Sequence, residues 1–392
     1  MSEWKEYKFS DIAEVIGGGT PDTFNVSYWN GDIPWLSPKD LTGYSKIYIS
    51  KGERNITSDG LKNSSAKLLP KDTVLLTTRA PIGYVAIAEN EIATNQGFKN
   101  FVLKKDYADC KFVYYWLKNN IDYLRSIGTG TTFAEISGSV VKEIKILLPP
   151  LSEQKSIASI LSSLDDKIDL LHRQNATLEK MAETLFRQWF IEDAKEEWEC
   201  YKLKDLVKHV KPGTNFQPKR IEYGIPFLNV RNLNNGFIDL SDTTKISKEE
   251  YQRVHKNWEP EENDILISRI GTLGIVAVIQ GSDLPVAVHY NMINLKAKTI
   301  SYQFLYFLLK SQLFKEKYFS NVRQSVQEYV TIEDTENVEI SLPIGTDLFK
   351  EHEIAFNELF NKIKSNQTQI RTLTALRDTL LPKLMSGEIR VL

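Results

Sequence analysis

The chain has 392 residues, 42% of them hydrophobic and 26% charged, which is enough for two domains with separate cores. The 49 basic and 51 acidic residues give a net charge of −2, which excludes the uniform positive field of a non-specific nucleic-acid binder. The two cysteines, Cys110 and Cys200, support neither a disulfide framework nor a thiolate metal site. Because no segment resembles a signal peptide or a membrane span, we expect a cytoplasmic protein.

The two halves of the chain repeat one another. Trp4-x-x-Tyr7-Lys8 recurs as Trp198-x-x-Tyr201-Lys202, and Ile33-Pro34-Trp35-Leu36 recurs as Ile225-Pro226-Phe227-Leu228. The remaining matches are Arg79 and Gly83 with Arg269 and Gly274, and Phe112, Tyr114, Leu117 and Lys118 with Phe304, Tyr306, Leu309 and Lys310. The repeat is far longer than a solenoid unit, so each copy should be a domain with its own core.

The expected organisation alternates domain and helix. We predict an α+β fold in which two duplicated globular domains are joined by two long antiparallel coiled-coil helices with pseudo-twofold symmetry. The predicted segments are a first domain over 1–150, a helical segment over 151–197, a second domain over 198–343 and a helical segment over 344–392.

In the first domain, short β-branched runs are separated by Gly, Pro, Asn and Asp, and one helical pattern follows near the end. The runs predict strands over 72–77, 84–88 and 142–148, and a helix over 111–124. This mixture is typical of an α+β domain whose function lies on its loops.

Five polar or flexible loops recur in both halves. A Gly-rich turn lets backbone amides approach a phosphate, although such a turn is often only a turn. Arginine at a strand end can reach guanine or phosphate, or form a surface salt bridge, and Asn and Gln can read adenine or cap a turn. The candidate DNA-binding residues of the first domain are Gly18, Thr20, Lys39, Thr78, Arg79, Asn95, Gln96, Lys99 and Thr131. Those of the second domain are Thr214, Arg231, Asn232, Ser268, Arg269, Tyr290, Asn291, Arg323 and Gln324.

The first long helix carries a heptad seam, because its apolar residues alternate at steps of four and three. Ser152 is a plausible N-cap. Asn175, the polar member of the seam, either fixes register as a buried amide or lies at a solvated edge. The predicted seam residues are Ile157, Leu161, Leu164, Ile168, Leu171, Asn175, Leu178, Ala182, Leu185 and Trp189.

The second long helix carries a similar seam, and Pro382 is expected to end it. Two seams in one chain can bury each other, and the returning chain favours antiparallel pairing; alternatively, each seam pairs with another subunit. The predicted seam residues are Phe356, Leu359, Ile363, Asn366, Ile370, Leu373 and Leu380.

Residue patterns for catalysis are weak. The chain contains neither Gly-x-x-x-x-Gly-Lys-Ser/Thr nor Gly-x-Gly-x-x-Gly before a βαβ unit, and its five histidines are scattered. We therefore expect no metal, no cofactor and no catalytic residue in this chain. A self-contained DNA methyltransferase or nuclease, and a duplicated protein-binding scaffold, remain as alternative interpretations.

The borders of the helices resemble a known family. Leu148-Pro149-Pro150-Leu151-Ser152-Glu153-Gln154-Lys155 looks like the central conserved region of type I restriction-modification specificity subunits, and the stretch from Leu376 to Ile389 resembles their distal conserved region. The two Trp-x-x-Tyr-Lys signatures resemble the usual starts of the family's target-recognition domains. The sequence departs from the family's pattern at Leu342-Pro343-Ile344-Gly345, where the family usually has the motif Pro-Pro-Leu-x-Glu-Gln.

The resemblance implies a non-catalytic reader of double-stranded DNA. In that family each target-recognition domain reads one half of a split site, and the helices set the spacing and bind modification (methyltransferase) subunits, here expected to be two. Those partners carry S-adenosylmethionine, and restriction subunits add translocation and cleavage.

Overall fold

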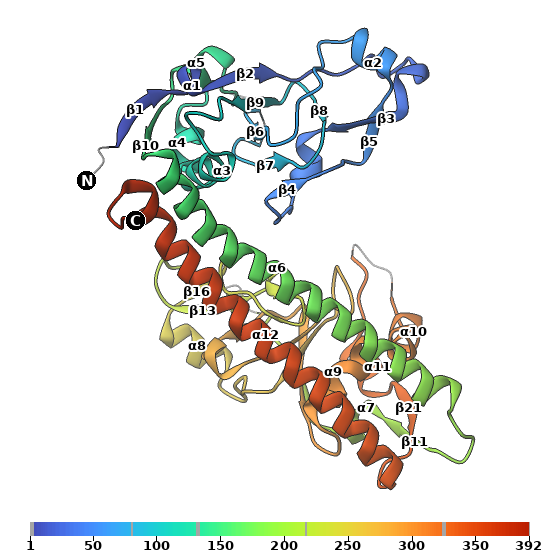
Figure 1. Ribbon diagram of the computed structural model, residues 1–392. Helices are drawn as coiled ribbons and strands as arrows, with labels where there is room; N and C mark the ends of the chain where they lie inside the picture. The colour runs from blue at the N-terminus through green and yellow to red at the C-terminus, as the bar shows by residue number, and fades with distance from the viewer. Residues whose placement is uncertain (1–3, 80, 131–133, 216–217, 324–326, 392) are drawn as a thin grey trace. The chain divides into compact units, whose positions relative to one another are not determined.

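The computed structural model describes residues 4–79, 81–130, 134–215, 218–323 and 327–391. The chain divides into two compact units, Met1–His172 with Thr368–Leu392 (unit 1) and Arg173–Gln367 (unit 2). Each unit therefore contains one globular domain together with part of each long helix. Figure 1 shows both units as mixed helix and sheet, which confirms the predicted α+β class.

The domain of unit 1 is built on a five-stranded sheet. Its strands, in spatial order, are β2 (Ala13–Gly17), β9 (Phe98–Leu103), β6 (Val74–Thr77), β7 (Val85–Ala88) and β4 (Tyr48–Ile49). Every residue of β6 and β7 is buried, which explains why their sequences are continuously apolar rather than alternating. A second sheet has the order β5 (Arg54–Ile56), β3 (Trp29–Leu36) and β8 (Ala93–Thr94).

One helix of this domain covers the five-stranded sheet. α3 (Cys110–Asn119) packs on β6 and β7 (Figure 1), and the Asp109 carboxylate caps it by accepting from the Phe112 amide at 3.0 Å. The helix predicted over 111–124 is two helices, because α3 ends at Asn119 and α4 (Ile121–Ser126) follows after Asn120. The Asn120 side chain donates to the Trp116 carbonyl at 2.8 Å and so stabilises this break.

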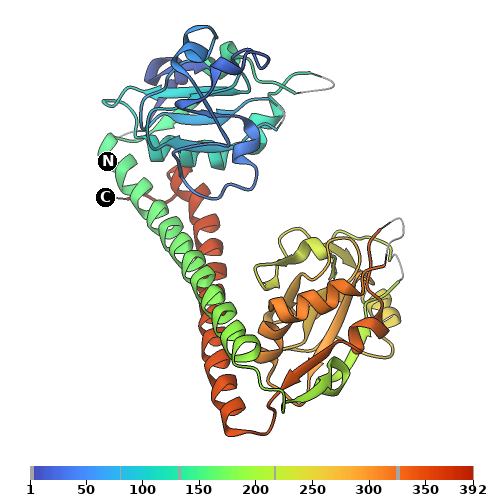
Figure 2. The ribbon, with the colours of Figure 1, turned by 90° about the vertical axis from the view of Figure 1, so that its right-hand side faces the viewer.

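The domain of unit 2 repeats this plan. Its larger sheet has the order β12 (Val207–Pro212), β20 (Met292–Ala297), β17 (Ile265–Ser268), β18 (Val276–Val278), β15 (Phe237–Ile238) and β14 (Leu233–Asn234). Its smaller sheet has the order β16 (Thr244–Ile246), β13 (Ile225–Leu228) and β19 (Ala287–Val288). α9 (Tyr302–Lys310) packs on β18 and β20, as α3 packs on β6 and β7 (Figures 1 and 2). The duplication predicted from sequence is therefore a duplication of fold.

Each domain is entered and left through a two-stranded ribbon. β1 (Lys5–Lys8) pairs with β10 (Lys145–Leu148), and β11 (Glu199–Lys202) pairs with β21 (Glu339–Leu342). A one-turn helix follows the first strand of each ribbon, α1 (Phe9–Ile12) in one and α7 (Leu203–Leu206) in the other. The carboxylates of Asp11 and Asp205 accept from the backbone amides of Lys8 and Lys202 at 2.9 and 3.0 Å, so the aspartates recur because they cap. The remaining α-helices of the two domains are α2 (Ser58–Lys62), α5 (Gly138–Glu143), α8 (Lys248–Val254), α10 (Gln312–Ser320) and α11 (Ile332–Glu336).

The two long helices are α6 (Leu151–Arg187) and α12 (Asp347–Ser386). The Gln154 amide donates to the Pro150 carbonyl at 3.0 Å, so the helix starts one residue before Ser152 and the predicted cap is wrong. The prediction that Pro382 ends the second helix is also wrong, because Pro382 lies inside α12. Only one further turn follows it, which limits the cost of its missing amide proton.

Within each unit the two helices pack against each other in antiparallel orientation. In unit 2 the Asn366 amide donates to Asn175 Oδ1 at 2.8 Å, and further along α6 the Trp189 ring stacks on His352 at 4.1 Å. In unit 1 Arg377 pairs with Asp165 at 2.7 Å, and Arg390 pairs with Glu153 at 2.6 Å. Within each unit the partner on or just after α12 lies earlier in the chain as the residue on α6 lies later, which confirms intramolecular antiparallel pairing. Buried seam residues are Ile157, Leu161, Leu171, Ala182, Phe356, Ile363, Asn366 and Ile370, while Leu164, Ile168, Asn175, Leu178, Leu185, Trp189, Leu359, Leu373 and Leu380 are half-buried.

The asparagine pair in unit 2 is expected to cost stability. Asn366 is fully buried and its Oδ1 atom has no hydrogen-bond partner among the described residues. Asn366→Leu alone should lower the free energy of unfolding by about 1 kcal/mol, because it leaves the half-buried Asn175 Oδ1 atom without its hydrogen-bond donor. Asn175→Leu combined with Asn366→Leu should restore or exceed the original value. Urea denaturation of the two singles and the double measures this, and a double variant weaker than both singles would contradict it.

Candidate nucleic-acid interface

The predicted binding loops of the first domain meet at one edge of the five-stranded sheet. The carboxyl ends of β2 and β6 lie beside the amino end of β9, since Gly17 is in register with Lys99 and Thr77 with Phe98. The Gly-rich turn follows β2, the Thr78-Arg79 pair follows β6, and Asn95-Gln96 precedes β9. The topology therefore brings together residues that are far apart in the sequence.

The Gly-rich turn packs directly on the Asn95-Gln96 loop. The Gly19 amide donates to the Thr94 carbonyl at 2.8 Å, and the Thr20 hydroxyl is hydrogen-bonded to Gln96 Oε1. A Cβ atom at Gly18 would collide with the carbonyl oxygen of Asn95. Gly18 thus has a structural role, namely close backbone approach, while Gln96 is exposed beside it.

One carboxylate organises the basic residues at this edge. Glu135 lies 3.6 Å from Arg79 Nε and 4.0 Å from Lys99 Nζ. Its backbone pairs with Thr129 through hydrogen bonds of 3.0 and 2.9 Å and also forms a β-bridge with Arg79. Two cations share one anion, so the three side chains together keep an excess positive charge, which is suited to phosphate or guanine acceptors.

The second domain forms the same edge with different side chains. Pro212 is in register with Ile293, and Ser268 with Met292. The Thr214 amide donates to the Val288 carbonyl at 2.8 Å, which repeats the contact of Gly19 with Thr94. The glycine turn is thus held against the neighbouring loop in both copies.

Arg269 occupies the position of Arg79 but has different surroundings. Its amide donates to the Asn291 carbonyl at 2.9 Å, and its Nε atom is buried with no hydrogen-bond partner among the described residues. Burial lowers the pKa of the Arg269 guanidinium from its ordinary value, and the nearby Tyr290 and Tyr318 offset part of this effect. Arginine remains charged at any physiological pH, so a half-buried cation stands at this edge.

Several predicted residues hold loops in place. The Thr78 and Ser268 side chains are buried; Ser268 Oγ accepts from the Ile275 amide at 2.8 Å, and Thr78 Oγ1 donates to the Gly97 carbonyl at 3.4 Å. Asn232 is also buried, and its amide group donates to the Asp239 and Asp242 carbonyls at 3.2 and 3.1 Å. Such internally satisfied groups position a loop and are not available to a ligand.

The other predicted residues have varied surroundings. Lys39 pairs with Glu53 at 2.9 Å, Arg231 with Asp242 at 3.5 Å and Arg323 with Asp334 at 3.0 Å. Tyr290 and Asn291 are half-buried. Thr131 and Gln324 lie outside the described residues.

Sequence reasoning missed three residues near these loops. Glu135 was overlooked because an isolated glutamate carries no pattern, although it faces Arg79 and Lys99. Phe24 and Tyr223 were overlooked because large aromatic residues are expected in a core, and both are strongly exposed. Their flanking residues, Asp22 and Asn25 in one loop and Gly224 in the other, mark them as loop residues.

Each domain is attached to α6 through a tyrosine and a carboxylate. Tyr115 donates to Asp165 Oδ2 at 2.6 Å in unit 1, and Tyr306 donates to Glu179 Oε1 at 2.9 Å in unit 2. Burial, followed by the neighbouring carboxylate, raises the pKa of both hydroxyls, so they stay protonated donors. A cation completes each group, Arg377 at 2.7 Å from Asp165 and Lys310 at 2.7 Å from Glu179.

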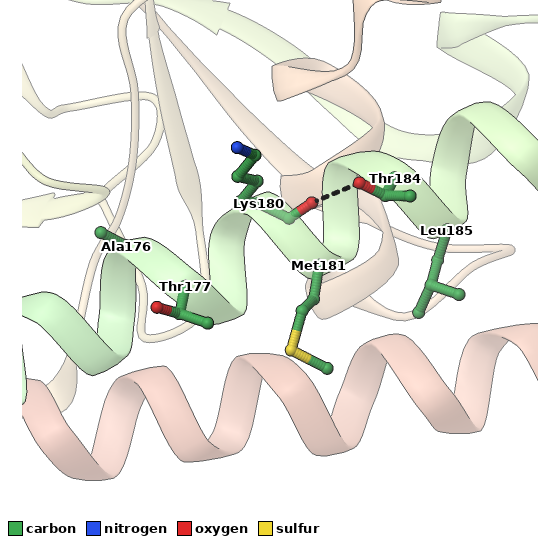
Figure 3. Close-up of a pocket in the computed structure, with 6 residues that line it drawn as sticks. All are labelled: Ala176, Thr177, Lys180, Met181, Thr184 and Leu185. Atoms are coloured by element: carbon green, nitrogen blue, oxygen red, sulfur yellow. Dashed lines mark hydrogen bonds between the residues drawn. The ribbon is translucent and has the colours of Figure 1, made fainter.

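A shallow groove lies on α6 in unit 2. Figure 3 shows Met181 and Leu185 pointing toward the neighbouring helix and Lys180 pointing away from it. The lining residues are Ala176, Thr177, Lys180, Met181, Thr184 and Leu185. Among the described residues no group of three or more His, Cys, Asp or Glu side chains is arranged to hold a metal ion. The described helices include none that is both long and apolar enough to cross a membrane.

The chain contains two copies of one α+β domain, and each copy gathers polar and basic loops at one sheet edge. This arrangement is typical of a binding protein with two similar ligand-binding domains. Residues 1–180 and 195–375 match the family model described as type I restriction modification DNA specificity domain. The chain belongs to this family.

Relatives of known type cover nearly the whole chain. The MjaIX type I restriction enzyme specificity subunit of Methanocaldococcus jannaschii is 40% identical, over 99% of this chain and 94% of the relative. The HindI specificity subunit of Haemophilus influenzae is 23% identical, over 99% of this chain and all of the relative (100%). The crystal structure of the S subunit from M. genitalium covers 98% of this chain and 96% of its own, with a TM-score of 0.59 and 20% identity, and so shares the fold.

Proposed function

We propose that this chain is the DNA specificity subunit of a type I restriction-modification complex and that each domain reads one half of a split DNA site. The observation that carries the proposal is the duplicated sheet edge with different side chains in its two copies. One edge presents Arg79 and Lys99 around a shared carboxylate, and the other presents a half-buried Arg269 next to Tyr290. Because base readout depends on donor and acceptor positions, two such edges select different bases.

The long helices carry the second part of the proposed role. We infer that they hold the two domains at a set spacing and dock two methyltransferase subunits. The duplication supports the number two, since Thr177, Met181 and Thr184 on α6 recur as Thr372, Leu376 and Thr379 on α12. Met181 and Leu376 are exposed, as expected of a docking surface. Methyl transfer from S-adenosylmethionine, and translocation and cleavage by restriction subunits, would reside in those cytoplasmic partners.

Methylome sequencing tests the proposal. Cells that contain the modification subunit are compared with and without this gene, and a methylated motif in two parts separated by a fixed gap should depend on the gene. The absence of any such motif would refute the proposal. Methyl transfer or cleavage by the purified chain alone would instead favour a self-contained enzyme, and binding without sequence preference would favour a protein-binding scaffold.

The two edge arginines should contribute to DNA affinity to different degrees. Arg269→Ala should weaken binding of the cognate duplex by about 1–3 kcal/mol, because its guanidinium is half-buried at the edge and its Nε donor has no hydrogen-bond partner among the described residues. Arg79→Ala should have a smaller effect, since Arg79 also pairs with Glu135. Fluorescence anisotropy at fixed salt measures both. Arg187→Ala, on α6 and paired with Glu192 at 3.2 Å, is the matched control; equal losses in all three variants would argue against edge contacts.

A further inference from the structure

The most exposed hydrophobic side chains lie in one loop of the repeat. Phe24, Val26 and Tyr223 are 93%, 77% and 77% exposed, more than any other large hydrophobic residue that the structure describes. Phe24 and Val26 lie between β2 and β3, and Tyr223 lies between β12 and β13. These two connections are equivalent in the duplication. Single exposed hydrophobic residues are ordinary, but their recurrence at the same place in both domains needs a cause.

The loop of the first domain is braced so that Phe24 stays exposed. The Phe24 amide donates to Asp22 Oδ1 at 3.0 Å, and Trp29 Nε1 donates to the Asp22 carbonyl at 3.1 Å. Beyond Phe24, Asn25 Oδ1 accepts from the Ser27 amide at 3.1 Å. These contacts fix the backbone on both sides, so the ring is held out in water instead of packing on the domain.

The loop of the second domain is braced by other contacts. The Ile221 amide donates to the Lys245 carbonyl at 3.0 Å, and a Cβ at Gly224 would collide with the Ile246 carbonyl. The Lys245 ammonium lies 5.8 Å from the centre of the Tyr223 ring. In the first domain the Arg54 guanidinium lies 3.5 Å from the centre of the Trp29 ring. A cation therefore lies over the exposed Tyr223 ring itself in the second domain, and over the buried Trp29 ring that follows the loop in the first; cations near both loops suit a ligand with phosphates.

Phe24 and Tyr223 belong to the same connections as Thr20 and Thr214 of the proposed DNA edge. Phe24 follows Thr20 by four residues, so the two cannot be more than about 14 Å apart. The Thr20 hydroxyl contacts Gln96 at the sheet edge. A major groove is about 12 Å wide, so a duplex on the edge lies within reach of Phe24.

We propose that Phe24 with Val26, and Tyr223 in the other domain, are wedges that enter the DNA between stacked base pairs. The inference rests on the proposed function and deepens it. Apolar side chains inserted at a base step partly unstack it and kink the duplex. Each domain then selects its half-site by the deformability of that step as well as by base edges. A stable protein interface buries about 800 Å² on each partner, and one or two side chains at a loop tip supply far less.

The test uses the complex of the full chain with its modification subunit. The probe is a duplex with the split motif found by methylome sequencing, in which 2-aminopurine replaces adenine at successive steps. Binding of the original protein should raise the fluorescence at one step in each half, because unstacking relieves quenching. Phe24→Ala should abolish the rise in one half only and weaken binding about tenfold. Tyr223→Ala should act on the other half.

Two further variants and three outcomes make the test decisive. Phe24→Leu should retain most of the rise, since an aliphatic wedge suffices, and Leu147→Ala, exposed on β10, should change nothing. Tight binding to the split motif with no fluorescence rise would overturn the wedge and leave the proposed function intact. Loss of the modification subunit from Phe24→Ala, with DNA binding unchanged, would identify a protein contact and also overturn it. A methylome without a split motif would refute the proposed function itself.

Discussion

Replacing residues 198–343 by the corresponding domain of a relative is expected to change one half of the methylated motif completely and leave the other half unchanged. The physical reason is the ribbon that closes the second domain. Glu199 on β11 is in register with Leu342 on β21, so the two ends of the exchanged segment lie side by side. Because both sheets of this domain lie inside that segment, the exchange cuts no sheet.

The exchanged domain must keep its contacts with the helices. The rings of Phe304 and Phe307 lie 5.6 and 5.4 Å from Phe356 on α12, and Tyr306 bonds Glu179 on α6. The relative that supplies the new domain must therefore have aromatic residues at these positions. Methylome sequencing reads both halves at once, and exchange of residues 1–150 is the reciprocal control. Altered bases in both halves after a single exchange would contradict independent reading by the two domains.

The large elements of the fold could be predicted because they depend on local patterns. The seams follow a heptad period, and the repeat of Trp4-x-x-Tyr7-Lys8 at Trp198 reveals the duplication without any knowledge of tertiary structure. Element ends were less predictable. Pro382 is tolerated because it lies near the end of α12, and the helix predicted over 111–124 is interrupted at Asn120 by a side-chain hydrogen bond.

The roles of individual site residues depend on contacts that no local pattern contains. Asn232 and Ser268 resemble candidate ligands in the sequence, yet their polar atoms are used by backbone groups of their own loops. Arg79 and Arg269 match in the repeat, but the long-range approach of Glu135 gives the first a carboxylate partner, whereas the second is half-buried beside Tyr318 and Tyr290. Similar sequence positions thus acquire different electrostatic surroundings, which is the property that two different half-sites require.

Phe304→Ala is expected to cause the largest loss of stability among single substitutions in the second domain. Phe304 on α9 is fully buried, and its ring lies 5.9, 5.4 and 5.1 Å from those of Phe186, Phe190 and Phe349. The cluster joins the domain to both long helices of unit 2. Truncation leaves a cavity between elements that cannot close together, so the free energy of unfolding should fall by about 3–5 kcal/mol.

Urea denaturation followed by circular dichroism measures this loss. The matched control is Phe319→Ala, an exposed phenylalanine on α10, which should cost less than about 1 kcal/mol. Phe112 is the counterpart of Phe304 in the repeat and is equally buried, so Phe112→Ala should destabilise unit 1 by a similar amount. A loss below about 1 kcal/mol for Phe304→Ala would mean that the domain does not depend on the helices for its core. The contact of Phe304 with the long helices would then contribute little to stability, and the relative that supplies an exchanged second domain would not need matching aromatic residues.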